Sequence, residues 1–392
     1  MKANNGRVIR LEGIWRLATD PANAGKEQGW YKQARPDAKP APVPGIIQQV
    51  FPTFHGVAWY WLEFEPARLP SPDERALIRF GAVEYLAEVW LNGQPIGGHE
   101  NGETPFELDA TSALRAQANI LAVRVVKPGS KDRIDGLILG EIPHRNQNDY
   151  GVYQPGMGYN TSGIVLPVEL RLVPAVRIAD MFARPDVATG RIEVQVTIRN
   201  DTGKPQTGKL AAAVAAAREG DCLHEAAMPM AASPGDSVHH VTLSVGSPRL
   251  WSLDDPYLYR VTADLQAGDG SPYEHESSVR CGFREFRVVD GFFHLNGQRV
   301  FLRSSHTGNH FPIGHVVPPD PALMRRDLFM AKASGFNCLR YIAGLDDSDS
   351  AFAAMAEAKI QASMFWVLRD TVAEFGYDRV KKYDSIFARA AA

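Results

Sequence analysis

The chain has 392 residues, and its 42 lysines and arginines nearly balance its 45 aspartates and glutamates, so the formal net charge is −3. At about 150 residues per domain, this length suggests two or three domains, and the 45% hydrophobic and 22% charged fractions are typical of a folded chain. The charge balance argues against a nucleic-acid partner, no segment reaches the roughly 20 apolar residues that span a bilayer, and the N-terminus lacks a signal-peptide core. We therefore expect a multi-domain cytoplasmic protein with no nucleic-acid or membrane partner.

Residues 1–174 are predicted to be rich in β-strands. Short runs of β-branched and aromatic residues, such as Trp59 to Phe64, are separated by Gly, Pro, Asn and Asp. The Asn92-Gly93 pair follows an alternating run and is typical of a tight hairpin, which needs two residues with positive φ. This spacing predicts a two-sheet antiparallel sandwich. The polar segment 127–160 is long for a loop in a compact domain, and loops of that length are usually functional or lie against a neighbour.

Residues 175–287 show a simpler alternation of polar and apolar residues. Examples are the runs Arg191 to Ile198 and His240 to Val245. About 110 residues with several short strands predict an immunoglobulin-like sandwich. The Ala-rich stretch 210–217 favours helix by propensity, whereas its position between strands favours strand equally, and the sequence leaves this choice open.

Residues 288–392 are predicted to alternate between strands and helices. The Asn296-Gly297 pair indicates a second hairpin, and a helix is expected to begin at Pro321 and to end at Gly335. The further expected elements are a strand, a helix and a strand at 337–342, 348–359 and 364–368. Strands that alternate with helices are typical of a parallel α/β unit.

Seven blocks of this sequence, taken in order, resemble glycoside hydrolase family 2, the group of β-galactosidases, β-glucuronidases and β-mannosidases. The blocks are AWYWLEFE (Ala58 to Glu65), VWLNGQPIGGH…TPFELDAT (Val89 to Thr111), NILAVRV (Asn119 to Val125), SGIVLPVEL (Ser162 to Leu170), RLWSLDDPYLYRV (Arg249 to Val261), CGFREFRVVDGFFHLNGQRVFLRS (Cys281 to Ser304) and DLFMAKASGFNCLRY (Asp327 to Tyr341). The resemblance implies a jelly-roll sugar-binding domain over 1–174, an immunoglobulin-like sandwich over 175–287 and the N-terminal portion of a (β/α)8 TIM-barrel catalytic domain over 288–392.

The resemblance also implies a reaction, the retaining hydrolysis of the O-glycosyl bonds of β-glycosides in carbohydrate metabolism. This reaction uses two glutamates, which the family places in an Asn-Glu pair after the fourth barrel strand and at the seventh strand. Residues 288–392 are fewer than half of the about 250 residues of a barrel, and no Asn-Glu pair follows residue 287. We therefore expect a truncated or divergent barrel without catalytic residues, inactive alone. The alternatives are a non-catalytic carbohydrate-binding or partner-binding protein on the same scaffold, and an enzyme completed by a second polypeptide.

Substrate contacts are implied at five positions. Arg340, at the end of the second barrel strand, matches an active-site arginine whose guanidinium could hold a carboxylate, and a structural ion pair is its alternative. His306, Asn309 and His310 match a loop that touches the sugar, and their side chains can hydrogen-bond hydroxyls, although a polar loop without a role is equally compatible. Asp370 lies at the predicted end of the third strand, but one carboxylate cannot carry out a double displacement.

Two further glutamates and three strand tryptophans could suggest a function, but a structural or solvent-exposed role is favoured for each. Glu357 and Glu374 are expected to be solvated charges. The strand tryptophans Trp59, Trp61 and Trp90 could form a sugar-stacking platform, but their bulk favours the core.

Metal and cofactor sites are not expected. The His-rich loop lacks regular spacing and an acidic or Cys partner, so we expect no metal, and the resemblance implies no cofactor. A disulfide framework or a CxxC site is excluded, because the three cysteines are odd in number and far apart, at Cys222, Cys281 and Cys338. A carbohydrate is the expected ligand, and homo-oligomers are possible because jelly-roll faces often mediate assembly in relatives.

Overall fold

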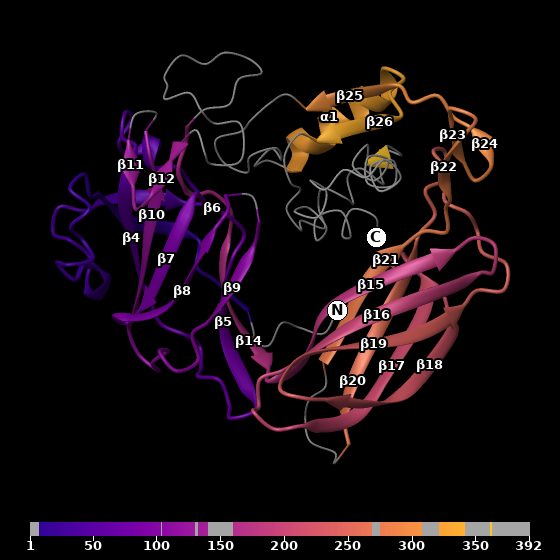
Figure 1. The fold of residues 1–392 in the computed structure, drawn as a ribbon, viewed down its shortest axis with the longest axis horizontal. Helices are drawn as coiled ribbons and strands as arrows, with labels where there is room; N and C mark the ends of the chain where they lie inside the picture. The colour runs from indigo at the N-terminus through magenta and orange to yellow at the C-terminus, as the bar shows by residue number, and fades with distance from the viewer. Residues whose placement is uncertain are drawn as a thin grey trace. The chain divides into compact units, whose positions relative to one another are not determined.

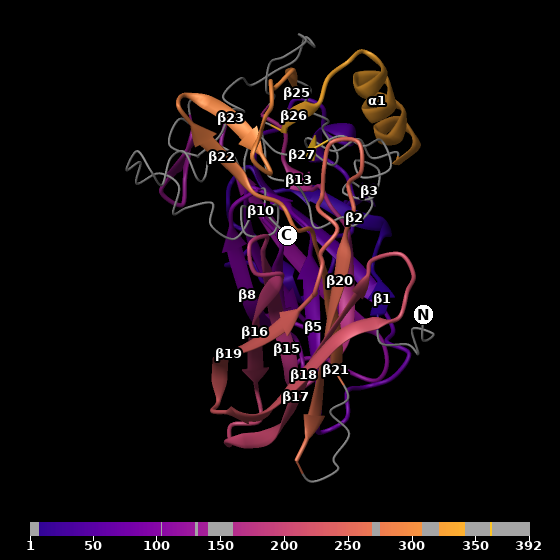
Figure 2. The same ribbon diagram turned by 90° about the vertical axis from the view of Figure 1, so that its right-hand side faces the viewer.

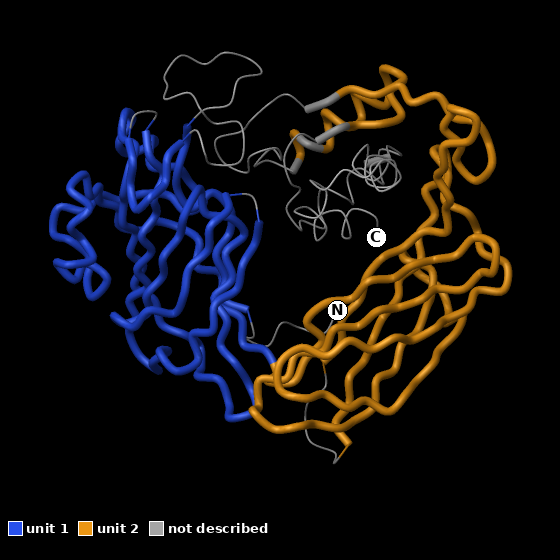
Figure 3. The backbone as a smooth tube through the Cα atoms, in the orientation of Figure 1, with its two compact units in different colours: residues 1–173, 307–321, 342–348 blue, residues 174–306, 322–341, 349–392 orange. Residues whose placement is uncertain are grey.

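The computed structural model describes residues 8–102, 104–129, 132–139, 160–268, 275–307, 321–341 and 361–362, drawn as a ribbon in Figures 1 and 2. The chain divides into two compact units (Figure 3). The first unit contains residues 1–173, 307–321 and 342–348, and the second contains 174–306, 322–341 and 349–392. Of the helices that the structure describes, none combines the length and the apolar character of a membrane span.

The first unit is built on two β-sheets. One sheet has six antiparallel strands in the order β3-β2-β4-β10-β7-β8, and the other has four strands in the order β1-β14-β5-β9. The strands of the six-stranded sheet are β2 (Gly13–Thr19), β3 (Lys39–Val43), β4 (Gly56–Phe64), β7 (Leu86–Leu91), β8 (Gln94–Glu100) and β10 (Asn119–Lys127). Those of the four-stranded sheet are β1 (Val8–Arg10), β5 (Glu74–Phe80), β9 (Phe106–Asp109) and β14 (Val168–Pro174).

Short elements complete this unit. They are the strand pairs β6 (Val83–Glu84) with β13 (Gly163–Ile164) and β11 (Arg133–Ile134) with β12 (Leu137–Ile138), and the 3-10 helices η1 (Trp30–Lys32) and η2 (Ile47–Gln49).

Strand β4 is buried on both faces because the six-stranded sheet is covered on both sides. Successive side chains of a strand point to opposite faces. Accordingly, Tyr60 joins the main core between the sheets, whereas Trp59 and Trp61 pack with Trp90 on the opposite face. The segment between β2 and β3 contributes Trp30 and other side chains, which cover these three tryptophans. The three are thus core residues, as their bulk favours, and do not form an open platform.

The second unit contains a sandwich of a three-stranded sheet, β15-β16-β19, and a four-stranded sheet, β18-β17-β20-β21. The strands are β15 (Val176–Asp186), β16 (Arg191–Asn200), β17 (Gln206–Ala216), β18 (Cys222–Ala232), β19 (Gly235–Ser244), β20 (Tyr259–Ala267) and β21 (His275–Cys281). The Ala-rich stretch forms β17, which pairs with β18 and β20 on its two sides. Leu210, Ala212 and Val214 alternate into the core. Tertiary pairing therefore overrides the helical propensity of alanine.

After the sandwich comes a hairpin sheet of β22 (Phe286–Val289), β23 (Phe292–Leu295) and β24 (Gln298–Arg299) (Figure 1). It is followed by β25 (Ser304–Thr307), helix α1 (Pro321–Ala333), β26 (Cys338–Tyr341) and β27 (Gln361–Ala362). The expected helix is confirmed, and Gly335 follows it with φ +86°, a conformation suited to glycine. Strand β26 pairs with β27 in parallel. The helix and strand expected at 348–359 and 364–368 lie outside the described residues.

Both Asn-Gly pairs form the predicted tight turns. Asn92 and Gly93 have φ values of 53° and 80°, and Asn296 and Gly297 have 51° and 77°. Two successive positive values are the signature of the type I′ turn, whose twist matches that of the flanking strands. The mostly-β architecture with two sandwiches is therefore as predicted.

Candidate functional site

The structure places two of the five predicted substrate contacts on neighbouring strands. His306 belongs to β25 and Arg340 to β26, and these strands are adjacent in a three-stranded sheet completed by β27. The other three positions, Asn309, His310 and Asp370, lie outside the described residues, as do Glu357 and Glu374. The role of all five positions stays a prediction.

The beginnings of β25 and β26 are joined by a buried amide, the side chain of Asn337, which is 6% exposed. Its Oδ1 accepts a hydrogen bond from the Arg303 N–H at 2.8 Å, and its Nδ2 donates to the Phe301 carbonyl at 3.0 Å. The Arg303 carbonyl in turn accepts from the backbone N–H groups of Asn337 and Cys338, at 3.0 and 3.3 Å. A single side chain thus satisfies backbone groups of the segment that leads into β25.

Sequence reasoning did not single out Asn337. A signal was available, because this asparagine stands between the C-cap Gly335 and the apolar strand that follows, a place where a buried polar side chain needs partners. Its partners, Phe301 and Arg303, are more than 30 residues away along the chain. The sequence therefore gives the residue but not its role.

In the first unit, a buried ion pair lies at the base of the long polar segment 127–160. The Lys127 Nζ is 2.6 Å from the Glu84 carboxylate and donates to the Thr161 carbonyl at 2.9 Å. Beside it, the buried Asn160 Nδ2 donates to the Pro128 carbonyl at 3.0 Å. These contacts join the two ends of the segment. The Lys127 ammonium is paired with the Glu84 carboxylate and therefore has a structural role.

Next to this pair, Tyr85 donates a hydrogen bond to the Glu100 carboxylate at 3.1 Å. Burial raises the pKa of the Tyr85 hydroxyl, and the neighbouring carboxylates of Glu100 and Glu84 raise it further. Tyr85 therefore stays protonated at neutral pH and can only act as a neutral hydrogen-bonding group.

A second buried cation, Arg124, fastens the β11–β12 hairpin to the sheet. Its guanidinium donates hydrogen bonds to the side-chain oxygens of Asn23 and Asp135, each at 2.5 Å, and to the Glu88 carboxylate. Burial alone would raise the pKa of Asp135, but the hydrogen bonds from Arg124 and Asn23 lower it. Asp135 is therefore ionised and committed to this network.

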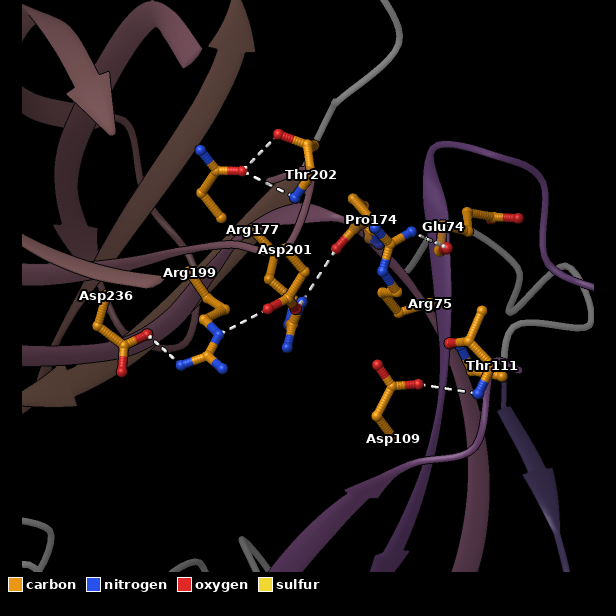
Figure 4. A network of polar contacts seen from close by, with 12 residues as sticks. Glu74, Arg75, Asp109, Thr111, Pro174, Arg177, Arg199, Asp201, Thr202 and Asp236 are labelled. Carbon is orange, nitrogen blue, oxygen red and sulfur yellow. Dashed lines mark hydrogen bonds and ion pairs between the residues drawn. The ribbon is translucent and has the colours of Figure 1, made fainter. Parts of the chain in front are cut away.

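In the second unit, the polar contacts near the start of the sandwich are also structural (Figure 4). Asp201 accepts hydrogen bonds from Arg177 at 2.6 Å and from Arg199 at 2.7 Å, and Arg199 reaches Asp236 at 3.2 Å. These contacts join the three neighbouring strands β15, β16 and β19 at one end of their sheet. Among the described residues, no group of three or more His, Cys, Asp or Glu side chains is placed to hold a metal ion.

Two antiparallel sandwiches followed by a strand–helix–strand segment define a modular protein in which β-domains precede an α/β unit. Family models match both sandwiches: residues 8–139 match "Glycosyl hydrolases family 2, sugar binding domain" and residues 176–284 match "Glycosyl hydrolases family 2". Together they cover more than half of the chain, in the order that the sequence blocks predict. The chain belongs to glycosyl hydrolase family 2, and its sugar-binding domain implies a carbohydrate ligand.

Individual relatives agree with this assignment. A β-galactosidase of Vibrio cholerae is 29% identical over 276 residues, which are 68% of this chain and 25% of the relative. Among solved structures, a Ruminococcus gnavus β-glucuronidase aligns with a TM-score of 0.68 at 21% identity, covering 91% of this chain and 59% of that one. A family 2 member from Bacteroides cellulosilyticus aligns with a TM-score of 0.71 at 19% identity, covering 98% and 52%. At these identities the structures support the fold, and the chain spans only part of each relative.

Proposed function

We propose that the chain comprises the sugar-binding domain, the immunoglobulin-like domain and the first strands of the catalytic TIM barrel of a retaining β-glycoside hydrolase. The observation that carries this proposal is the parallel pair β26–β27, which follows a helix and comes after two family 2 domains in the family's order. The reaction of the whole enzyme is hydrolysis of an O-glycosyl bond in carbohydrate metabolism.

The proposed substrate contacts are His306, Asn309, His310, Arg340 and Asp370. Active sites of such barrels lie at the C-terminal ends of the strands, where these positions are expected. Double displacement needs two carboxyl groups about 5–5.5 Å apart. Because no Asn-Glu pair follows residue 287, we expect the isolated chain to bind a sugar without hydrolysing it.

The test is to mix the purified chain with the 4-nitrophenyl β-glycosides of galactose, glucuronic acid and mannose. We expect no release of nitrophenolate, together with saturable binding of at least one glycoside by calorimetry. Turnover that is abolished by Asp370→Asn would overturn the expected inactivity. Failure to bind any of the three glycosides would count against a glycoside as ligand.

The alternative is a non-catalytic carbohydrate-binding or partner-binding protein on the same scaffold, which is favoured by the fact that the two family matches lie on the sandwiches, at 8–139 and 176–284. Adding a polypeptide that supplies the later barrel strands separates the two: activity should appear if the chain is part of a hydrolase and should stay absent if it is a binding protein. We also propose a cytoplasmic location and self-association through the sugar-binding domain, testable by fractionation and by sedimentation.

A further inference from the structure

The buried amide of Asn337 stands where two strands begin. It accepts from the Arg303 N–H and donates to the Phe301 carbonyl, so it holds two backbone groups of the segment that enters β25. Its own backbone and that of Cys338 donate to the Arg303 carbonyl. Asn337 and Arg303 are therefore joined by hydrogen bonds in both directions. A shift of one strand along the other by one residue would break these bonds.

The backbone hydrogen bond from Cys338 to Arg303 indicates how the strands pair. In a parallel ladder, a residue donates to the carbonyl of the residue that precedes its partner. The Arg303 carbonyl accepts from both Asn337 and Cys338, but β25 begins at Ser304 and β26 begins at Cys338, so the Cys338 bond is the one that belongs to the ladder. The residue opposite Cys338 is then Ser304. Strands β25 and β26 each have four residues and are connected through helix α1, the type of connection that parallel neighbours require.

We propose that Asn337 is a positioning residue: it fixes a parallel register in which Ser304 lies opposite Cys338 and His306 lies opposite Arg340. The Cα atoms of such partners are about 4.8 Å apart, the spacing of neighbouring strands. The two positions proposed to contact the sugar are therefore set side by side by hydrogen bonds that Asn337 makes to Phe301 and Arg303, just before the two strands begin. The inference rests on the proposed function only in naming a sugar as the ligand.

The register is tested by disulfide formation in the full chain, in a Cys222→Ser background that removes the exposed thiol. Cα separations of 4.4–6.8 Å allow a disulfide, so Ser304→Cys should link to Cys338 on treatment with diamide. Ser305→Cys is the matched control, because its partner in this register is Leu339. Linkage of Ser305→Cys but not of Ser304→Cys, read by peptide mapping, would overturn the proposed register.

The role of Asn337 is tested in the same background. Asn337→Ala should lower the rate of the 304–338 linkage about tenfold, the order expected when buried hydrogen bonds are lost. Asn337→Asp keeps the oxygen that accepts from Arg303 and should rescue part of the rate. The control is Asn200→Ala: Asn200 is 1% exposed and its Nδ2 donates to two carbonyls of the sandwich, at 2.8 and 2.9 Å. An unchanged linkage rate in Asn337→Ala, or an equal loss in Asn200→Ala, would overturn the positioning role.

A last arm measures binding of 4-nitrophenyl β-D-galactoside by calorimetry. Asn337→Ala should bind about tenfold more weakly than the parent, and closing the 304–338 disulfide in that variant should restore the affinity, since the lock replaces the lost hydrogen bonds. An affinity that the lock does not restore would count against positioning. If the parent chain does not bind this glycoside, the proposed ligand fails for galactosides, and the linkage rates alone decide the inference.

Discussion

The Glu84 carboxylate and the Lys127 ammonium lie 2.6 Å apart inside the first unit, and their side chains are 7% and 1% exposed. Glu84 ends the short strand β6, and Lys127 ends the central strand β10. Lys127 also holds the carbonyl of Thr161, just before β13, the partner of β6. One buried cation therefore ties three segments that are distant in the sequence.

Removing this cation should be costly. Lys127→Met leaves the Glu84 carboxylate buried without its partner, and we expect a loss of about 3–5 kcal/mol in the free energy of unfolding. The double variant Lys127→Met/Glu84→Gln should recover much of this loss because no charge is left buried. The measurement is urea unfolding followed by tryptophan fluorescence. The surface control is Lys26→Met, which removes a 48% exposed partner of Glu88 and should cost less than about 1 kcal/mol; equal costs would contradict the prediction.

Gly25 lies against three buried side chains, and we expect Gly25→Ala to destabilise the first unit. A Cβ at this position would lie 2.5 Å from Trp59 Nε1, 2.7 Å from Asp20 Oδ2 and 2.9 Å from Trp30 Cδ2. Asp20 also accepts the Gly25 N–H at 2.8 Å and the Trp59 N–H at 3.1 Å, so the site has little freedom to shift. Overpacking of this kind costs about 1–3 kcal/mol. The control is Gly246→Ala, where a Cβ meets nothing within 4 Å; thermal unfolding should separate the two variants.

The Arg68–Glu74 pair should make stability depend on acid pH. Hydrogen bonds from Arg68, at 2.6 and 2.8 Å, lower the pKa of Glu74 from 4.5 to about 2. Because the folded-state pKa is lowered, the pair contributes fully above the unfolded pKa of 4.5, and its contribution is lost as pH falls towards 2. Arg68 is 40% exposed, so screening limits the effect to about 1 kcal/mol.

Unfolding of the parent and of Glu74→Gln between pH 2 and pH 6 checks this prediction. The two proteins should differ near pH 6 and converge near pH 2, and 1 M salt should shrink the difference because a pair at the surface is screened. A difference that is constant over the whole range would show that the ionisation of Glu74 is not responsible.

The native cysteines should differ sharply in reactivity. Cys222 is exposed, whereas Cys281 and Cys338 are buried. Burial raises the pKa of the Cys281 thiol to about 12, so almost no reactive thiolate is present at pH 8. We expect Ellman's reagent to label one thiol per native chain and all three in denaturant. Cys222→Ser should abolish the native signal, and rapid native labelling of this variant would contradict the burial of the other two.

Features set by neighbouring residues were predictable from the sequence. The two Asn-Gly turns and the helix between Pro321 and Gly335 depend on φ preferences and end signals within a few residues. The Ala-rich stretch could not be decided locally, because alanine favours helix in isolation while pairing with β18 and β20 gives its backbone groups their partners.

For the candidate site, the sequence predicted which positions are involved but not the contacts that hold them in place. The resemblance pointed to Arg340 and His306, and the structure puts them on adjacent strands. The hydrogen bonds of Asn337 were not foreseen, because their partners lie more than 30 residues away. A polar residue in a strand pattern shows that a partner must exist, but it does not show which one.

The sequence by itself determined the family, the order of the two β-domains and the local turns, because these depend on composition, motif order and backbone preferences within a few residues. The tertiary structure decided which faces of the sheets are covered and which charged side chains form ion pairs. Only folding showed that Trp59 and Trp61 are covered by Trp30, and that Glu84 neutralises Lys127. The physical reason is that burial and ion pairing depend on which strands become neighbours, which chain spacing alone does not specify.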